Sequence, residues 1–174
     1  MQEKSKYQQL LKSKISYFDP NHDLELPELS GKVVFTNGCF DILHQGHVEY
    51  LAASADLGDS LVIGVNSDES VRALNKGPER PINSEQSRAI VLAALGFVKA
   101  VVVFNDNNPF DLIQAIKPDV LVKGGDYDPT VSDSSDKRYI IGSDIVRSKG
   151  GEVATIQLSE GFSTTSIVNR IKNE

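Results

Sequence analysis

Two histidines and a glycine stand where an apolar run, residues 33–35, is followed by a helical pattern. The segment is His44-Gln45-Gly46-His47. The first turn of a helix leaves backbone N–H groups without intrahelical partners, and the helix dipole adds positive potential at that end. A helix start of this kind binds anions, phosphates in particular. His44, Gly46 and His47 are therefore candidates for a phosphate site.

Two later segments have residue types that suit the same ligand. Residues 123–127, Lys-Gly-Gly-Asp-Tyr, follow another apolar run, and their glycines let a ligand approach the backbone closely. Residues 163–166, Ser-Thr-Thr-Ser, open the last helical pattern, where hydroxyl and amide groups donate to phosphate oxygens. An ordinary helix cap explains this last segment equally well when it is taken alone. Its occurrence together with His44 and Gly124 favours a shared anion site.

Several common nucleotide and metal motifs are absent. No Gly-x-Gly-x-x-Gly follows the first apolar run, and the chain has neither a P-loop sequence nor Gly-x-Ser-x-Gly. The two histidines lack a third His or Glu at a natural spacing, so phosphate binding is favoured over metal binding by this pair. Cys39 is the single cysteine, which excludes an internal disulfide and a thiolate metal cluster.

Composition indicates one compact domain. The chain has 174 residues, of which 40% are hydrophobic and 24% are charged, enough to form one sizeable core. The net charge of −6 argues against a nucleic-acid partner, although local cations still suit a small anionic ligand. No run of eighteen apolar residues and no signal-peptide pattern occurs, so we expect a cytoplasmic protein with no membrane partner.

Five short runs rich in Val, Ile, Leu and Phe predict the strands that position these segments. The runs are 32–36, 60–65, 100–104, 119–122 and 152–158. They lack alternation, which is typical of strands buried on both faces, and helical patterns separate them. The alternation predicts an α/β, Rossmann-like open sheet, mainly parallel and five-stranded, with helices on both faces. Its ligand is then expected beyond the carboxyl ends of the strands.

Cap and turn residues predict where several helices begin and end. Asn83 with Gln86 resembles a capping box, Asn108-Pro109 predicts a helix start, and Lys117-Pro118 predicts its end. Residues 1–30 are interpreted as an N-terminal helix and linker, either packed on the sheet and involved in a dimer contact or partly mobile, and residues 31–174 as the domain that contains the candidate site. The polar loop 128–139 is either a substrate lid or disordered.

Residues 36–47, Thr-Asn-Gly-Cys-Phe-Asp-Ile-Leu-His-Gln-Gly-His, resemble the signature of the HxGH nucleotidyltransferases. The similarity continues through 65–68, 80–83, 85–88, 122–127 and 160–165, and covers residues 32–173. Within that family the segments look most like the adenylyltransferase domain of bacterial ADP-heptose synthases. The resemblance implies transfer of AMP from ATP to D-glycero-β-D-manno-heptose 1-phosphate. The sugar-kinase domain often fused to that domain is missing, so we expect a separate kinase to supply the sugar phosphate.

The resemblance also implies roles for individual residues. It makes His44, His47 and Lys76 catalytic, with Lys76 closing over the reacting phosphates. The implied nucleotide-binding residues are Thr36, Asn37, Gly38, Phe40, Asp41, Gly46, Lys123, Gly124, Asp126, Ser163, Thr164 and Thr165, and the implied substrate-binding residues are Asn66, Arg80 and Arg88. Asp41 either holds His44 or a magnesium-bound water, or shapes a turn. Mg²⁺ is the expected cofactor because it accompanies nucleoside triphosphates, and its protein ligands stay unassigned.

Alternative functions stay open at this point. Glycerol-3-phosphate cytidylyltransferases are similar as well, but the Arg that precedes their Glu-Gly-Ile-Ser-Thr-Thr segment is absent, because Leu158 and Ser159 stand before Glu160 here. A CTP-dependent enzyme acting on a polyol phosphate is therefore one alternative. A noncatalytic nucleotide-binding module is the alternative from another class. The expected partners are ATP and a phosphorylated sugar, together with further copies of the chain in a homo-oligomer such as a dimer.

Overall fold

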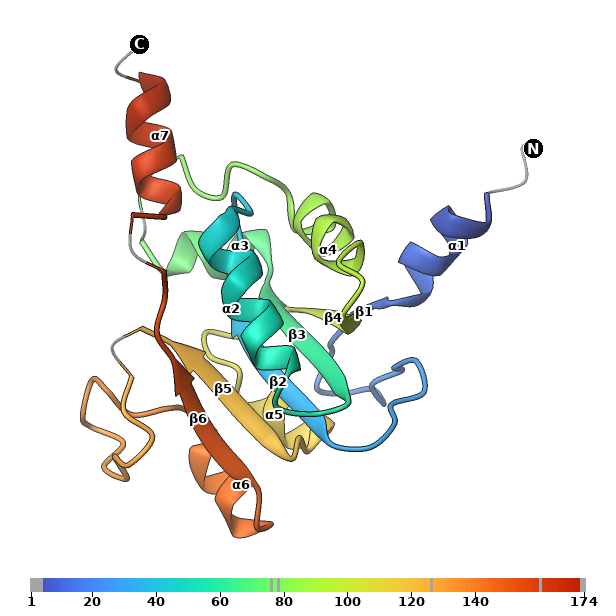
Figure 1. Cartoon of the computed structure of the whole chain (residues 1–174), viewed down its shortest axis with the longest axis vertical. Helices are drawn as coiled ribbons and strands as arrows, with labels where there is room; N and C mark the ends of the chain where they lie inside the picture. Colours follow the sequence, from blue (N-terminus) through green and yellow to red (C-terminus); the bar gives the residue numbers. More distant parts are fainter. Residues whose placement is uncertain (1–4, 76, 78, 126, 160, 173–174) are drawn as a thin grey trace.

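A single parallel sheet organises the chain (Figure 1). The computed structural model describes residues 5–172 apart from 76, 78, 126 and 160. The sheet has six strands in the order β1-β4-β3-β2-β5-β6, and every neighbouring pair is parallel. The strands are β1 (Ile15–Tyr17), β2 (Val33–Gly38), β3 (Ser60–Asn66), β4 (Val98–Phe104), β5 (Val120–Gly124) and β6 (Glu152–Ile156). The chain order reverses between β2 and β5, so the carboxyl ends of these two strands flank a natural ligand crevice.

The prediction of five strands was one short, because residues 15–17 form an additional edge strand. Ile15, Ser16 and Tyr17 pair with residues 101–103 of β4. The backbone N–H of Phe18 continues this contact by donating to the Val103 carbonyl at 2.8 Å. A three-residue edge strand has too few positions to show a hydrophobic period, so the sequence pattern predicts an N-terminal helix and linker for this segment. The prediction of an α/β sheet covered by helices is confirmed.

Helices cover both faces of the sheet. On one face, α2 (Gln45–Ala55) and α4 (Glu85–Ala93) pack Leu51, Ala89 and Leu92 against β-strand side chains. On the other face, α5 (Phe110–Ile116) and α6 (Ser143–Ser148) contribute Leu112, Ile113 and Val146 to a second cluster. The short helix α3 (Asp68–Ala73) follows β3 directly. Burial of apolar surface on both faces holds the strands in place beneath the ligand crevice.

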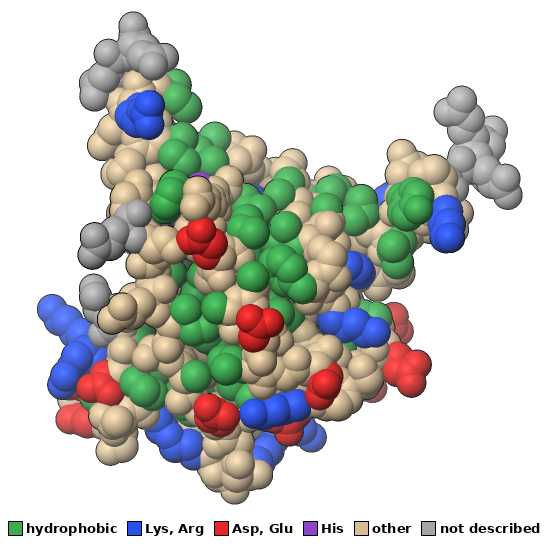
Figure 2. Space-filling model, in the orientation of Figure 1, with side chains coloured by type: hydrophobic (Ala, Val, Ile, Leu, Met, Phe, Trp, Pro, Cys, Tyr) green, Lys and Arg blue, Asp and Glu red, His purple; other side chains and the backbone are tan. Residues whose placement is uncertain are grey.

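The two terminal helices project from this body (Figure 1). Helix α1 (Lys6–Ser13) and helix α7 (Thr164–Lys172) each contain no buried residue. Leu11 of α1 nevertheless packs at the margin of the core on the α4 side. Figure 2 shows hydrophobic side chains gathered over the middle of the face in view. On α4, Ile90 and Val91 are exposed. In the described residues, no helix has the length and apolar character needed to cross a lipid bilayer.

Helix caps differ from the predicted ones by one residue in two places. Helix α4 is capped by Ser84, whose hydroxyl accepts the Ser87 N–H, because Asn83 is used by the turn around residue 41. Pro109 is the N-cap of α5, and Asn108 accepts the Phe110 N–H at 3.0 Å. The predicted helix end at Lys117 is confirmed, with that residue in the left-handed conformation. Both predicted caps lie one residue before the observed cap, and at α4 the neighbouring Ser84 is also a favoured cap residue.

Candidate active site

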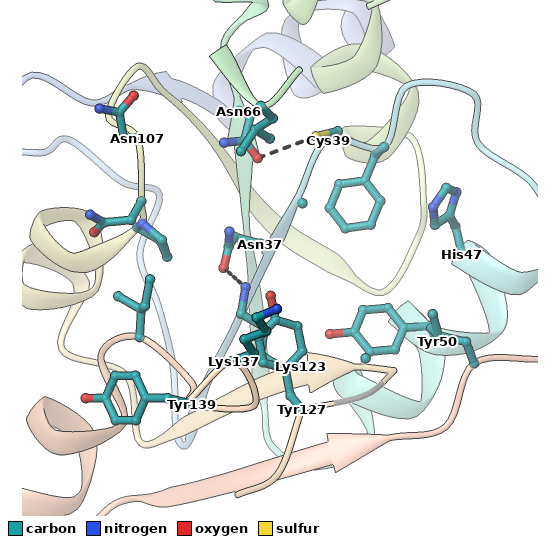
Figure 3. A pocket seen from close by; sticks show the side chains of 18 of the residues that line it. Asn37, Cys39, His47, Tyr50, Asn66, Asn107, Lys123, Tyr127, Lys137 and Tyr139 are labelled. Atoms are coloured by element: carbon teal, nitrogen blue, oxygen red, sulfur yellow. Dashed lines mark hydrogen bonds between the residues drawn. The ribbon is translucent and has the colours of Figure 1, made fainter. Parts of the chain in front are cut away.

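A cavity of about 660 Å³ lies at the carboxyl edge of the sheet, over β2, β3 and β5 (Figure 3). Its volume is in the range of sites that hold a small organic ligand. The described residues that line it come from strand ends, from α2 and from the loops after β4 and β5. Asn37, Gly38, Phe40, His47, Asn66, Lys123 and Gly124 are the predicted site residues among them. The sheet topology thus brings together segments that are more than 80 residues apart in the chain.

The two histidines stack at the start of α2. His44 is the N-cap, and its Nδ1 accepts the backbone N–H of His47 at 3.3 Å. The imidazole centroids are 3.7 Å apart with the ring planes inclined by 17°, and Phe40 meets His47 edge-on at 5.3 Å. A side chain at Gly46 would meet Phe162 at 3.1 Å and the His44 ring at 3.4 Å. Glycine at position 46 therefore permits the close approach of the two segments.

Both imidazoles favour the neutral form. Burial, with a smaller contribution from neighbouring His44, lowers the pKa of His47 to about 4, although the Ile42 backbone opposes the shift. Burial also lowers the pKa of His44. A neutral imidazole still has one N–H donor, and a bound polyphosphate favours protonation because opposite charge raises a histidine pKa. The pair is thus suited to donate hydrogen bonds to charge that builds up on a phosphate.

Asp41 shapes the turn between β2 and α2. Its carboxylate is buried and accepts the backbone N–H groups of Ile82 and Asn83 at 2.8 to 3.0 Å. Arg80 Nε lies 2.5 Å from its second oxygen, and Asn83 Nδ2 donates to its backbone carbonyl at 2.6 Å. These contacts fasten the turn to the loop before α4. Of the roles considered for Asp41, the structure supports the one in the turn.

Arg88 holds the same turn through hydrogen bonds of its guanidinium group. Its residue is 2% exposed, and its guanidinium donates to the carbonyls of Cys39 and Asn83 at 2.6 and 3.0 Å. A third bond joins it to Asp68 at 2.8 Å. Five N–H donors in a rigid fork suit several carbonyl partners at once. These contacts place Arg88 under the turn rather than on the wall of the cavity, and they give it a positioning role.

A second buried network links α2 to the floor of the cavity. The Tyr50 hydroxyl donates to the Val122 carbonyl at 3.3 Å and shares a 2.6 Å hydrogen bond with Thr36 Oγ1. Burial raises the pKa of Tyr50 to about 12, so its hydroxyl keeps its proton. Thr36 is fully buried. Its side chain therefore fixes α2 relative to β2 and β5. Thr36 does not line the cavity, whereas the next residues of β2, Asn37 and Gly38, do.

Lys123 lies at the centre of the crevice. Its ammonium donates to Asn37 Oδ1 at 2.5 Å and lies 5.7 Å from the Tyr127 ring centroid (Figure 3). At the next residue, a Cβ on Gly124 would come within 2.8 Å of Leu158 and 3.1 Å of Tyr50. Glycine thus lets the strand end lie flat between two side chains. The arrangement places one cation beside a narrow apolar slot.

The segment at the start of α7 lies against the histidine pair. The Phe162 ring is stacked 6.4 Å from His44, and Ser163 Oγ accepts the Ser166 N–H at 3.0 Å. Ser163 is therefore a helix cap, as the simpler explanation of the segment predicted. Thr164 and Thr165 begin the helix beside it. This end of α7 places a second helix start beside the histidine pair.

Comparisons with known proteins decide the family. The cytidylyltransferase-like family matches residues 35–170. The chain belongs to this family. It is 53% identical over 149 residues to the bifunctional protein HldE of Syntrophotalea carbinolica, and 56% identical over 142 residues to that of Campylobacter concisus. These alignments cover 85% and 82% of the chain but only 29% and 27% of those proteins, so the chain spans less than a third of their length.

A solved structure agrees with this assignment. The lipopolysaccharide core biosynthesis protein from Thermoplasma volcanium matches with a TM-score of 0.57 and 28% identity, over 75% of this chain and 98% of that one. The chain is thus a nucleotidyltransferase with a Rossmann-like fold. The stacked histidines belong to the segment that carries the family signature. Their place at a helix start agrees with a site that binds the phosphates of a nucleotide.

Residues of the nucleotidyltransferase site fall into three groups. Those on the cavity wall are named above, and His44, Gly46, Ser163, Thr164 and Thr165 lie at the starts of α2 and α7. Thr36, Asp41, Arg80 and Arg88 support the turn and the helix around it. Lys76 and Asp126 lie outside the described residues. Their predicted roles stay predictions.

Sequence reasoning did not assign several residues that line the cavity. Tyr50, Asn107, Lys137, Tyr139 and Leu158 all contribute to it. In the sequence, Tyr50 is one position of a predicted helix and Asn107 is part of a loop, so neither residue indicates a functional role. The polar character of the loop 128–139 was noted, but which of its side chains face the ligand depends on the path of the loop. Only the fold supplies that path.

Proposed function

We propose that this nucleotidyltransferase transfers AMP from ATP to a sugar 1-phosphate, namely D-glycero-β-D-manno-heptose 1-phosphate, forming an ADP-sugar and pyrophosphate. The observation that carries the proposal is the stacked histidine pair at the start of α2, of which His47 lines a cavity that also contains Lys123. The resemblance of segment 122–127 to the adenylyl branch of the family supports ATP. The chain covers under a third of the relatives named bifunctional HldE. This partial coverage supports the proposal that the chain has one of their two activities.

The acceptor needs no general base in this reaction. A sugar phosphate already has an anionic oxygen, which attacks the α-phosphorus of ATP while the bond to the bridging β-phosphate oxygen breaks. Catalysis then consists of in-line positioning and stabilisation of charge on the α-phosphate and the departing pyrophosphate. His44, His47 and the first amides of α2 supply hydrogen-bond donors for that charge. Lys76 is proposed as a further cation that closes over the phosphates.

Mg²⁺ is proposed to enter with the triphosphate. The described residues contain no group of three His, Cys, Asp or Glu side chains arranged to hold a metal ion. The Asp41 carboxylate is occupied by two amides and Arg80. This donor set fits an ion held mainly by phosphate oxygens and water, which is the usual way in which Mg²⁺ is bound with nucleotides. When bound, the ion would neutralise charge on the leaving pyrophosphate.

Pyrophosphate release tests the proposed function. The chain is assayed with ATP or CTP against heptose 1-phosphate and glycerol 3-phosphate, and kcat/KM is measured for each pair. The expected result is the highest value for ATP with heptose 1-phosphate. A higher value for CTP with glycerol 3-phosphate would replace the substrates and keep the reaction class. Nucleotide binding without pyrophosphate release from any pair would identify a noncatalytic module.

A further inference from the structure

The two sides of the cavity differ in chemistry. The side formed by α2 and its neighbours contains Phe40, His47 and Tyr50, with Leu158 closing over Gly124. The opposite side contains Asn107 and Asn108 from the loop before α5, together with Lys137 and Tyr139 from the loop after β5. Figure 3 shows Asn107 and Tyr139 on the side of the cavity away from His47, and Lys137 near Lys123 in the middle of the view. One side is largely aromatic and apolar, and the other contains amides, a tyrosine ring, the Lys137 cation and the Asp136 carboxylate.

Local hydrogen bonds give the second wall a defined shape. Asp136 Oδ1 accepts the Arg138 N–H at 2.8 Å, and its carbonyl accepts the Tyr139 N–H at 3.0 Å. The Tyr139 hydroxyl lies 3.2 Å from Asp144 of α6, which fastens this end of the loop to the body. Lys137 stands between Asp136 and Arg138 and lines the cavity. The turn therefore presents a cation to the ligand without needing to fold around it.

Asn66 extends the polar wall to the end of β3. Its side-chain amide donates to Ser70 Oγ at 2.9 Å, and the residue is 6% exposed. Its Oδ1 has only a weak contact with Cys39 Sγ at 3.9 Å, which leaves acceptor capacity on the cavity side. Side-chain amides offer donors and an acceptor together, the combination that a hydroxyl group needs.

We propose that Asn66, Asn107, Lys137 and Tyr139 form the subsite for the acceptor, with the amides binding its hydroxyl groups and the Lys137 ammonium binding its phosphate. This inference rests on the proposed function. It goes further by naming the residues of the cavity that recognise the acceptor. In-line transfer requires the attacking phosphate oxygen to approach the α-phosphorus from the side opposite to pyrophosphate. In the proposed function the histidine pair stabilises the departing pyrophosphate, so the acceptor is expected from the side of the cavity away from His47, where Asn107 and Tyr139 lie.

The recognition chemistry indicates a phosphorylated, hydroxyl-rich acceptor. Two asparagines and a tyrosine suit a polyol because each hydroxyl that enters a buried polar site must find a partner. An ammonium ion and a phosphate oxygen form a charge-assisted hydrogen bond, which is about twice as strong as a neutral one. The acceptor oxygen forms the new bond to the α-phosphorus, and the electron pair of the broken bond leaves with pyrophosphate. Lys137 takes part only in binding, so it is a specificity residue rather than an acid or base.

Steady-state kinetics test the assignment of Lys137. Lys137→Ala is expected to raise the KM for heptose 1-phosphate about tenfold or more while the KM for ATP changes less than about twofold. Lys149→Ala is the matched control, because it removes the same charge at the end of α6, away from the cavity. Asn107→Ala is expected to impair heptose 1-phosphate more than glycerol 3-phosphate, which has fewer hydroxyl groups. A parallel rise of both KM values in Lys137→Ala, or no rise, would overturn the subsite.

A binding measurement separates this inference from the proposed function. Heptose 1-phosphate is titrated calorimetrically into the protein saturated with an ATP analogue whose α,β-bridge is a methylene group. Binding that is weakened about tenfold in Lys137→Ala and unchanged in Lys149→Ala supports the subsite even if no acceptor is turned over. The proposed function alone fails in that case. Absence of binding to the unaltered protein, or equal binding to Lys137→Ala, would reject the subsite.

Discussion

Two uncharged imidazoles stack 3.7 Å apart at a site proposed to bind a highly charged polyphosphate, where charged side chains would be expected. Their burial gives an explanation. A permanently charged pair would repel itself in the apoenzyme, whereas neutral rings pack together and present N–H donors when the anion arrives. Donors that are already in place need no reorganisation when charge develops in the transition state. The histidines are therefore expected to matter more for turnover than for resting nucleotide binding.

Substitution of the histidines tests this expectation. His44→Ala and His47→Ala are each expected to lower kcat on the order of 10²-fold or more, the usual loss when one charge-stabilising donor is removed. The dissociation constant for ATP, measured by calorimetry, should change far less. His22→Ala is the control, since that histidine is exposed and paired with Asp19 in the N-terminal segment. Near-normal kcat in both active-site variants would reject the site.

The lowered pKa of His47 predicts a pH-dependent stability. In the unfolded chain His47 takes up a proton near pH 6.5, whereas in the folded protein its pKa is about 4. The unfolded state thus binds more protons between these values, and the free energy of unfolding falls as the pH falls from about 6.5 to 4. Urea midpoints at pH 7 and pH 5 should therefore differ less in His47→Gln than in the unaltered protein. An equal drop in both proteins would show that other groups carry the pH dependence.

Residue spacing predicted part of the site. The roles of the other residues depend on which side chains the fold buries and which partners it gives them. His44, Gly46 and His47 were assigned from their place after an apolar strand, and the structure puts them at the start of α2. Arg88 was assigned to the substrate because sequence shows its charge and not its partners. Its carbonyl acceptors belong to residues 39 and 83, which only the tertiary fold brings to it. The role of a buried charge is thus poorly visible from sequence.

At the scale of elements, the turn after β2 is held by the loop before α4 and by α4 itself. Arg88→Met removes the donors to the part-buried Cys39 and Asn83 carbonyls and the partner of Asp68. The expected loss is about 1–3 kcal/mol in the free energy of unfolding, measured by urea denaturation, together with lower kcat. Arg138→Met is the control for stability, because that exposed arginine forms surface ion pairs with Asp128 and Asp136 that contribute little. Equal losses in the two variants would contradict the positioning role.

Most elements were predicted from sequence, whereas β1 and α3 were not. The buried runs of β2, β3 and β4 have six or seven residues each and fill both faces of the sheet, so their apolar character was evident. β1 has three residues and α3 has six. Neither length covers enough periods for a hydrophobic pattern to emerge, and their formation depends on the neighbouring strand β4 and on the cap Ser67.

At the scale of the whole molecule, β1 covers one edge of the sheet. It pairs with Val101, Val102 and Val103 of β4, the central part of a strand that is apolar along most of its length. An uncovered apolar edge strand offers unpaired N–H and C=O groups to other chains. The N-terminal segment therefore protects the sheet from edge-to-edge association, while the cavity lies at the carboxyl ends of the strands.

Removal of residues 1–17 tests this protective role. The truncated chain is expected to unfold at lower urea concentration, because Leu11 and Ile15 no longer pack against the core, and to self-associate through the exposed edge of β4. Urea denaturation and size-exclusion chromatography with light scattering measure the two effects. Removal of residues 1–5 serves as the control, since it keeps α1 and β1. Pyrophosphate release by the fraction that stays unassociated should persist, because no described residue of the cavity wall belongs to the deleted segment. A truncated protein with an unchanged midpoint and no self-association would show that β1 is dispensable for the sheet.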